Sequence, residues 1–388
     1  MSLAVASMHF ERADRPQLNV LLPELRINGI FAGIHTAIEF ALSVATRLAL
    51  PVRLIPLGNS PKSEDKIQLE KFISREFNFK LPVSIVSARE LPGYPVSADD
   101  LWMATHWTTA HSIDVACRLG VLRRESVVYL VQDYEAGFDP WGSSYATART
   151  TYHAGFSTVV NSTPLQRYLQ EIEGLEIPDE MVFAPSLDLK RLLETAAARR
   201  RSPSQTVLFY ARPSKPRNLY DIGVASLSLA AKEVERLGLE VKFVSAGENH
   251  PPEKLTNTSS LVPLGKLPWD EYFRMLATAD VVLSLQHSPH PSHPPLDAIV
   301  SGAFAVTNEL SKTRAGLHGR LLVAEPDPQA LANQVISALL KSAQEDNAFD
   351  ASILELFGRP IADVVEAVSG KLKKITDPRD GAKRDEIA

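Results

Sequence analysis

The chain has 388 residues, of which 45% are hydrophobic and 22% charged, and its formal net charge is −5 at pH 7. This length exceeds one ordinary hydrophobic core and predicts two domains, and the composition is that of a globular protein rather than a disordered one. The mildly acidic balance argues against a dedicated nucleic-acid binder, which usually carries excess positive charge.

The single cysteine, Cys117, excludes an internal disulfide and favours a reducing compartment. The first residues, MSLAVASMHFERADRPQ, lack the basic start and the long apolar run of a signal peptide. No stretch approaches the ~20 apolar residues that a membrane-spanning helix needs. We therefore expect a cytoplasmic protein, at most peripheral at the inner face of the membrane.

Short β-branched runs alternate with amphipathic stretches, which is the pattern of parallel α/β sheets. In chain order the first half predicts strands at 18–22, 52–57, 83–86, 101–104, 127–131 and 157–160, and helices at 33–48, 64–77 and from Ser162 onward. The basic stretch 190–205 is predicted to contain the end of a helix followed by a linker. Beyond it, strands at 206–210, 241–245, 281–285 and 303–307 alternate with helices at 219–236 and 269–278.

Two such arrays predict an α/β fold with two doubly wound, Rossmann-like domains that face a cleft. We place the first domain at 1–195 and the second at 203–358, and assign 359–388 to a terminal helix and a mobile tail. Ligands of these sheets bind at the carboxyl ends of the strands, so the loops at those ends are the candidate sites.

A cationic turn follows the first strand of the second domain. Arg212, Lys215 and Arg217 stand between this strand and the next helix. Two guanidinium groups, an ammonium and a helix N-terminus together favour a diphosphate. A solvated basic turn is the alternative.

A loop rich in proline and histidine leads from the strand at 281–285 to a helix that carries Asp297 in its first turns. A carboxylate there would accept hydrogen bonds from sugar hydroxyls, or it would only favour the helix N-terminus. His287, His290 and His293 have no accompanying cysteine or fixed acid, so we expect no metal.

Four stretches together carry a family resemblance: Tyr-Ala-Arg-Pro…Arg-Asn (210–218), Leu-Gly-Lys-Leu (264–267), Ser-Pro-His-Pro-Ser-His-Pro-Pro-Leu (288–296) and Val-Gln-Asp-Tyr-Glu (131–135). Over about residues 18–325 the chain resembles glycosyltransferase family 4, whose members have the GT-B fold. It is most similar to the bacterial S-layer glycan β-1,2-rhamnosyltransferase subgroup, which uses dTDP-L-rhamnose. In that fold the terminal helix packs back on the first domain.

The resemblance implies that Arg212 and Lys266 hold the donor diphosphate, with Arg217 at a second cation position and Asp297 at the ribose. It also implies that Gly265, Lys266 and Leu267 run along the base. The first acid of the family's Glu-x7-Glu pair is missing, because Pro289 stands there beside His290. How the hydroxyls of the transferred sugar are held is therefore open, with His290 as the candidate.

Three stretches of the first domain are acceptor-side candidates. The loop Asn28–Gly33 is either a phosphate-facing loop, as the resemblance implies for Gly33, or a plain tight turn. His106 and Trp107 follow the strand at 101–104 and suit either a sugar-binding surface or core packing.

Asp133 and Glu135 follow the strand at 127–131. Asp133 is the candidate to orient or deprotonate the acceptor hydroxyl, and the alternative for both acids is bracing of the loop. Trp141 and Tyr145 either shape the acceptor site or close the loop over it.

The sequence thus predicts a metal-independent, retaining glycosyltransferase without a cofactor, in which Arg212, Lys266 and Asp133 carry the chemistry. Its expected partners are a nucleotide-diphosphate sugar, such as dTDP-L-rhamnose, and a glycan or lipid-linked glycan acceptor, with no nucleic acid. Peripheral association with the membrane is compatible with the basic end of the terminal helix. The alternatives are a GT-B-type nucleotide-sugar epimerase and a non-catalytic nucleotide-sugar binder.

Overall fold

The computed structural model describes residues 3–10, 15–26, 30, 32–93, 95–200, 202–290, 292–344 and 348–376. The chain divides into two compact units. Unit 1 comprises residues 1–184 and 358–388, and unit 2 comprises residues 185–357. Most of the predicted mobile tail, residues 377–388, lies outside the described residues.

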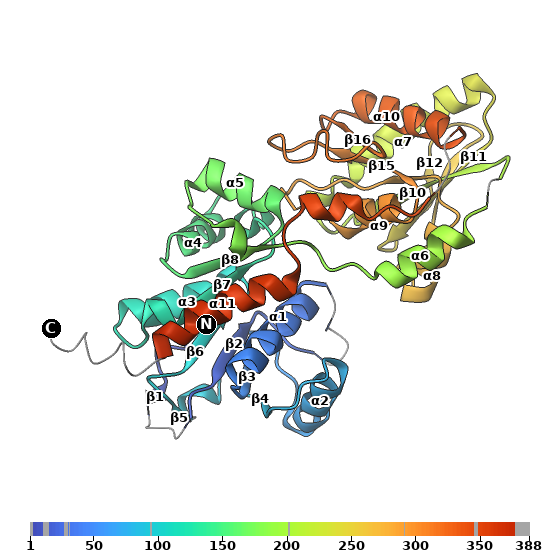
Figure 1. Ribbon diagram of the computed structural model, residues 1–388. Helices are drawn as coiled ribbons and strands as arrows, with labels where there is room; N and C mark the ends of the chain where they lie inside the picture. Colours follow the sequence, from blue (N-terminus) through green and yellow to red (C-terminus); the bar gives the residue numbers. More distant parts are fainter. Residues whose placement is uncertain are drawn as a thin grey trace. The chain divides into compact units, whose positions relative to one another are not determined.

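Unit 1 is built on a seven-stranded parallel sheet with the order β4-β3-β2-β6-β7-β8-β9 (Figure 1). Its strands are β2 (Leu18–Leu22), β3 (Val52–Pro56), β4 (Val83–Ile85), β6 (Leu101–Ala104), β7 (Val127–Val131), β8 (Ser157–Asn161) and β9 (Val182–Phe183). Its helices are α1 (Ala32–Leu48), α2 (Ser63–Glu76), α3 (Trp107–Arg118), α4 (Ser143–Tyr152), α5 (Thr163–Glu173) and α11 (Ile361–Thr376). A separate short pair joins β1 (His9–Phe10) to β5 (Pro95–Val96). The terminal helix α11 packs on α1.

Unit 2 contains a second seven-stranded sheet with the order β12-β13-β11-β10-β14-β15-β16, in which only the edge pair β12 and β13 is antiparallel. Its strands are β10 (Gln205–Ala211), β11 (Val241–Gly247), β12 (Glu253–Lys254), β13 (Ser260–Pro263), β14 (Val281–Leu283), β15 (Phe304–Asn308) and β16 (Leu321–Ala324). Its helices are α6 (Leu189–Ala198), α7 (Tyr220–Leu237), α8 (Trp269–Leu276), α9 (His293–Val300) and α10 (Pro328–Ser342).

Each sheet forms the centre of its own apolar core. Every residue of β2, β3, β6 and β7 is buried, and so is every residue of β14 and β15. Strands covered by helices on both faces become continuous apolar runs, which is why the sequence displays them so clearly. The predicted α/β fold with two doubly wound sheets is confirmed.

The boundary between the units differs from the predicted one. Helix α6, which the sequence analysis placed in the first domain, belongs to unit 2 and contacts α8 and α9. Buried Arg199, directly after α6, fixes it there by donating to the carbonyls of Leu276, Ala279 and Ser301. A buried guanidinium needs several acceptors, and three backbone carbonyls supply them.

Helix α4 is a second difference, because it begins inside the stretch that was expected to be a loop after Glu135. Its sequence, SSYATARTTY, is polar and has little apolar periodicity. The helix contacts α3 and the turn at 135–138, so tertiary packing rather than propensity forms it.

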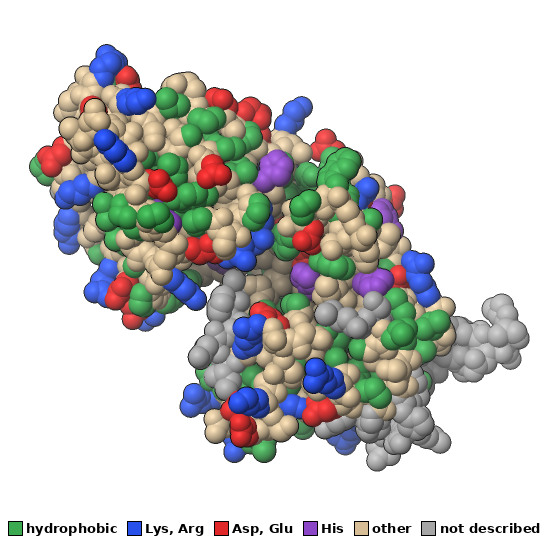
Figure 2. All heavy atoms as spheres, turned by 180° about the vertical axis from the view of Figure 1, so that it is seen from behind, with side chains coloured by type: hydrophobic (Ala, Val, Ile, Leu, Met, Phe, Trp, Pro, Cys, Tyr) green, Lys and Arg blue, Asp and Glu red, His purple; other side chains and the backbone are tan. Residues whose placement is uncertain are grey.

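The surface carries charges of both signs. Figure 2, seen from behind, shows lysine and arginine side chains interspersed with aspartate and glutamate. No large patch of one sign is visible on the described part of this face. Among the described helices, none combines the length and the apolar character that crossing a bilayer requires.

Candidate functional site

The cationic turn after β10 is organised around an acid that the sequence analysis missed. Arg212 Nε lies 3.6 Å from Glu248 Oε1, and the Glu248 carboxylate also accepts from the Ser214 N–H at 2.9 Å and from Ser214 Oγ at 2.8 Å. Burial opposes ionisation, but the Ser214 hydrogen bonds and the charges of Arg212 and Lys215 lower the pKa of Glu248. The turn is thus held in place rather than being a loose basic loop.

The Leu-Gly-Lys-Leu stretch contacts the end of β11, directly before Glu248. The Gly247 N–H donates to the Gly265 carbonyl at 3.0 Å, next to Glu248 in the chain. Gly265 has φ +67°, and a Cβ there would lie 2.1 Å from Asn249 Oδ1. Both the backbone conformation and the close approach therefore require glycine. Lys266, which follows, is exposed.

Asp297 is buried, with 5% of its surface exposed, and Tyr272 donates to its Oδ2 at 2.9 Å. Burial raises the pKa of Asp297 to about 7, against the effect of the Tyr272 hydrogen bond. Tyr272 stands on α8, the helix that follows Leu267. The ribose candidate is therefore tied to the helix after the Lys266 stretch.

The loop between β14 and α9 is held by Arg314, whose side chain is wholly buried. Its guanidinium donates to the carbonyls of Gln286 (2.8 Å), Asn308 (2.5 Å) and Ser288. The His287 N–H donates to the Arg217 carbonyl at 2.6 Å, which joins this loop to the cationic turn.

The predicted residues of unit 2 are therefore brought to one edge of its sheet. An ion pair joins the turn at 212–218 to Glu248, directly after β11. Hydrogen bonds join the last residue of β11 to Gly265, α8 to Asp297, and the loop at 286–290 to Arg217. This edge holds the carboxyl ends of β10, β11, β13 and β14, where doubly wound sheets bind ligands. Within the described residues, no group of three or more His, Cys, Asp or Glu side chains is arranged as a metal site.

In unit 1, Gln132 links the end of β7 to the start of α1. Its Nε2 donates to the Gly33 carbonyl at 2.8 Å, and Gly33 is exposed in the first turn of α1. Residues 28, 29 and 31 of the predicted Asn28–Gly33 loop lie outside the described residues. Gly33 and the loop that carries Asp133 are thus neighbours.

His106, Trp107 and Glu135 brace one another. His106 caps α3, since its Nδ1 accepts from the Thr108 N–H at 3.3 Å. The Trp107 N–H donates to Glu135 Oε2 at 2.5 Å, and Glu135 is only 4% exposed. Burial raises the pKa of Glu135 well above its ordinary value, and the charge of Asp133 adds to this. The structure thus gives Glu135 a bracing partner, while Asp133 stays half-buried beside it.

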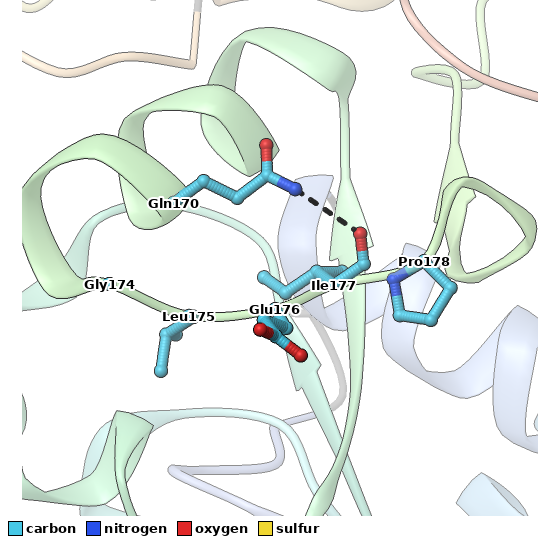
Figure 3. A pocket seen from close by; sticks show the side chains of 6 residues that line it. All are labelled: Gln170, Gly174, Leu175, Glu176, Ile177 and Pro178. Carbon is cyan, nitrogen blue, oxygen red and sulfur yellow. Dashed lines mark hydrogen bonds between the residues drawn. The ribbon is translucent and has the colours of Figure 1, made fainter.

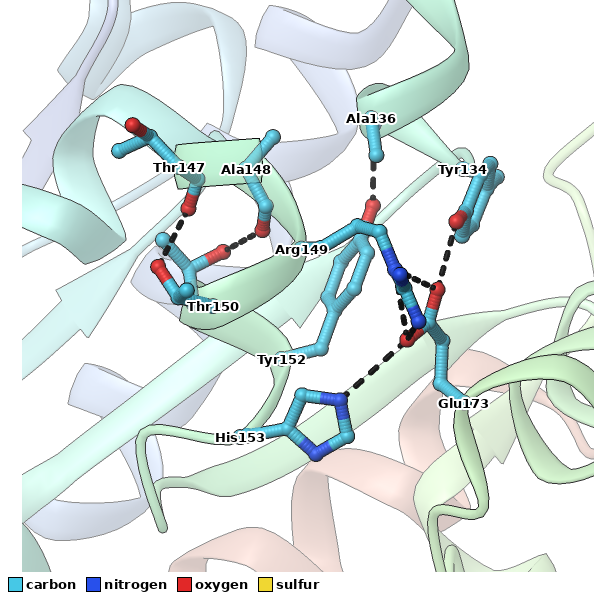
Figure 4. A network of polar contacts seen from close by, with 10 residues as sticks. Tyr134, Ala136, Thr147, Ala148, Arg149, Thr150, Tyr152, His153 and Glu173 are labelled. Carbon is cyan, nitrogen blue, oxygen red and sulfur yellow. Dashed lines mark hydrogen bonds and ion pairs between the residues drawn. The ribbon is translucent and has the colours of Figure 1, made fainter. Parts of the chain in front are cut away.

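A network of polar contacts around Glu173 holds the loop that carries Asp133 and Glu135 (Figure 4). Glu173 accepts a hydrogen bond from Tyr134 Oη at 2.6 Å. It also forms a bidentate ion pair with Arg149, whose Nε donates to Oε1 and whose Nη2 donates to Oε2, each at 2.8 Å. His153 Nε2 lies 3.3 Å away. Burial would raise the pKa of Glu173, but these three partners together lower it. Tyr134, the neighbour of Asp133, is thereby anchored.

Both halves of the chain match family models. Residues 17–163 match the N-terminal domain of WsaF, and residues 205–336 match the C-terminal domain of WsaF, so the two models together cover more than half of the chain. The chain belongs to the WsaF family of GT-B glycosyltransferases. A 251-residue segment is 32% identical to the O-antigen biosynthesis protein RfbC of Myxococcus xanthus. That match covers 63% of this chain but only 18% of RfbC, so the chain spans less than a fifth of that relative.

Solved structures agree with this WsaF-family fold. HepE of Anabaena in complex with UDP has a TM-score of 0.53 at 14% identity, covering 95% of this chain and all of that one. Apo OtsA has a TM-score of 0.60 at 11% identity, covering 92% and 99% of the two chains. WaaG, a glycosyltransferase involved in lipopolysaccharide biosynthesis, has a TM-score of 0.51 at 13% identity, covering 93% and 98%.

One hollow of the WsaF-family chain lies away from the candidate residues. A space of about 570 Å³ is lined by Gln170, Gly174, Leu175, Glu176, Ile177 and Pro178 (Figure 3). These residues connect the end of α5 to β9, so the hollow lies at the amino-terminal edge of the sheet of unit 1. That edge is opposite to the carboxyl ends of the strands, where ligands of such sheets bind.

Proposed function

We propose that the chain is a metal-independent, retaining glycosyltransferase that moves a neutral sugar from a nucleoside diphosphate to a glycan. The donor we infer is a deoxyhexose nucleotide such as dTDP-L-rhamnose, and the acceptor is a growing polysaccharide or a lipid-linked glycan. The placement of the turn at 212–218, Gly265 and Asp297 at the carboxyl-end edge of the sheet of unit 2 carries this proposal.

In this proposal unit 2 holds the donor. Arg212 and Lys266 grip the diphosphate, with Lys215 and Arg217 adding positive charge, and Asp297 accepts from the ribose hydroxyls. Gly265 to Leu267 run along the base. Donor binding replaces the contact between Arg212 and Glu248 by a contact with phosphate, which bears more charge and more acceptor oxygens.

The reaction breaks the bond between the anomeric carbon and the diphosphate oxygen while the acceptor hydroxyl attacks from the same face. The acceptor proton leaves through Asp133 or through a departing phosphate oxygen. Because Arg212 and Lys266 bear fixed positive charge, they stabilise the negative charge that develops on the leaving diphosphate. We place the acceptor side on unit 1, with His106, Trp107 and Asp133 as its candidates and Glu135 bracing their loop. Gly33 is the candidate of unit 1 for the phosphate.

The first experiment is a thermal-shift panel of dTDP, UDP and GDP and their sugar conjugates, with EDTA present throughout. Binding to the folded state raises the melting temperature by mass action, so the panel identifies the nucleotide. The best conjugate is then incubated with a glycan acceptor and the products are separated by mass. No stabilisation by any nucleotide would refute the proposal. Turnover of the donor alone to an epimer would favour an epimerase, and binding without any transfer would favour a non-catalytic binder.

A further inference from the structure

The side chain of His290 has a fixed orientation in the loop before α9. Its Nδ1 accepts a hydrogen bond from the Ser292 N–H at 3.1 Å, and its carbonyl accepts from Gln286 Nε2 at 3.3 Å. Since Nδ1 is an acceptor, the proton of the neutral ring must lie on Nε2. His290 is therefore a donor at a defined position.

That donor has no acceptor within the part of the chain that the structure describes. His290 is only 8% exposed, so water does not readily replace the missing partner. A buried N–H without an acceptor is costly, and such a group in a native protein calls for an explanation. The Arg314 guanidinium holds this loop by donating to the Gln286 and Ser288 carbonyls.

His290 is also neutral. Burial, assisted by the positive charge of Arg314, lowers the pKa of His290 to about 4. The ring therefore offers one uncharged N–H group and cannot act as a cation toward phosphate at neutral pH. The cations of the site lie instead in the turn at 212–217 and at Lys266.

Two uncharged side chains near this loop also have a buried polar atom without a hydrogen-bond partner among the described residues. Asn218 Oδ1 is one of them, while the Nδ2 of this side chain donates to the Leu285 carbonyl at 3.2 Å. Ser284 Oγ, one residue before Leu285, is the other. Both side chains are 1% exposed. His290 Nε2 is therefore a donor, Asn218 Oδ1 is an acceptor, and the Ser284 hydroxyl can be either. None of these three groups is charged.

We propose that His290, together with Asn218 and Ser284, forms the subsite for the transferred sugar and selects a neutral, hydroxylated ring. A hydroxyl group both donates and accepts, so it matches this mixed set of atoms, whereas a carboxylate only accepts and cannot satisfy Asn218 Oδ1. The subsite takes the place of the acid that is missing at Pro289. This inference rests on the proposed function, because it assumes that a nucleotide-sugar occupies this edge of unit 2.

The test compares the affinity for a nucleoside diphosphate with the affinity for its sugar conjugate, by isothermal titration calorimetry on the full chain. The pairs are dTDP with dTDP-L-rhamnose and UDP with UDP-glucose, and UDP-glucuronate serves as the charged-sugar probe. His290→Phe removes the N–H but keeps the ring volume, and His290→Gln restores a donor. His287→Phe is the matched control, since His287 is exposed in the same loop.

We expect His290→Phe to reduce the affinity gained from the neutral sugar about tenfold, while the Kd for the nucleoside diphosphate changes less than about twofold. His290→Gln should recover part of that gain, and His287→Phe should behave as the unmodified protein. Equal loss of diphosphate and conjugate binding, an unchanged sugar gain in His290→Phe, or an equal gain from UDP-glucuronate would overturn this inference. Failure of every nucleotide to bind the unmodified protein would instead reject the proposed function.

Discussion

Replacing Asp297 by asparagine should make unit 2 more stable at alkaline pH and at the same time weaken donor binding. The asparagine side chain preserves the shape and an oxygen that accepts from Tyr272, but it bears no charge. The buried carboxylate has a pKa of about 7 instead of an ordinary 3.8. Between these two values the folded chain keeps a proton that the unfolded chain has released.

The sign and size follow from this difference in proton binding. Because the folded state binds more protons, the Asp297 contribution to stability falls as the pH rises from about 4 to about 7 and is level above that. A difference of about 3 pKa units corresponds to roughly 4 kcal/mol as an upper bound. For a unit of this size, that is a rise of about 10 °C in melting temperature for Asp297→Asn at pH 8. Near pH 4.5 about a quarter of this difference should remain.

Differential scanning calorimetry from pH 4.5 to 8.5 tests this, with nucleotide titrations at pH 7.5 on the same samples. Asp221→Asn, which changes an exposed acid on α7, is the control and should shift neither property. A shift of equal size at pH 4.5 and at pH 8, or destabilisation at pH 8, would refute the assignment of a buried, proton-binding carboxyl group. Unchanged nucleotide affinity would remove Asp297 from the ribose site.

Three further changes test other parts of the site. Arg212→Ala should cost about 2–4 kcal/mol of transition-state stabilisation, measured as kcat/KM for transfer, and near-normal turnover would contradict its role at the diphosphate. Gly265→Ala should lower the melting temperature and abolish donor binding, because its φ is +67° and its Cβ would meet Asn249, whereas Gly238→Ala has the same φ but open space and should only lower stability slightly. Glu173→Gln should cost about 2–3 kcal/mol in urea unfolding, since Arg149 loses its charged partner, and a cost near zero would show that the network does not stabilise the fold.

The sequence predicted the central strands of both sheets well because they are short, buried, apolar runs. Strands β2, β6 and β7 have the predicted bounds, and seven others differ by one or two residues. The short strands β1, β5, β9, β12 and β13 were not predicted. Helix α4 was not predicted, because its polar residues have no helical periodicity. Strand β16 and helix α10 were also left without prediction, although Asp327 followed by Pro328 is a readable helix start.

The sequence indicates candidate residues where they stand together in one stretch, and it does not indicate the partners that lie far along the chain. Three cations between a strand and a helix are visible in a single stretch around Arg212. The partners Glu248, Tyr272 and Arg314 lie far along the chain, and no spacing rule links them to Arg212, Asp297 or His290. Only the folded sheet brings these loops to one edge.

The return of α11 to unit 1 has a consequence for the order in which the protein folds during synthesis. Val364, Val365, Val368 and Leu372 of this helix are buried in the core of unit 1. They leave the ribosome only after all of unit 2 has been made. Unit 2 can therefore complete its fold first, while the nascent first half keeps an open apolar groove until the last helix arrives.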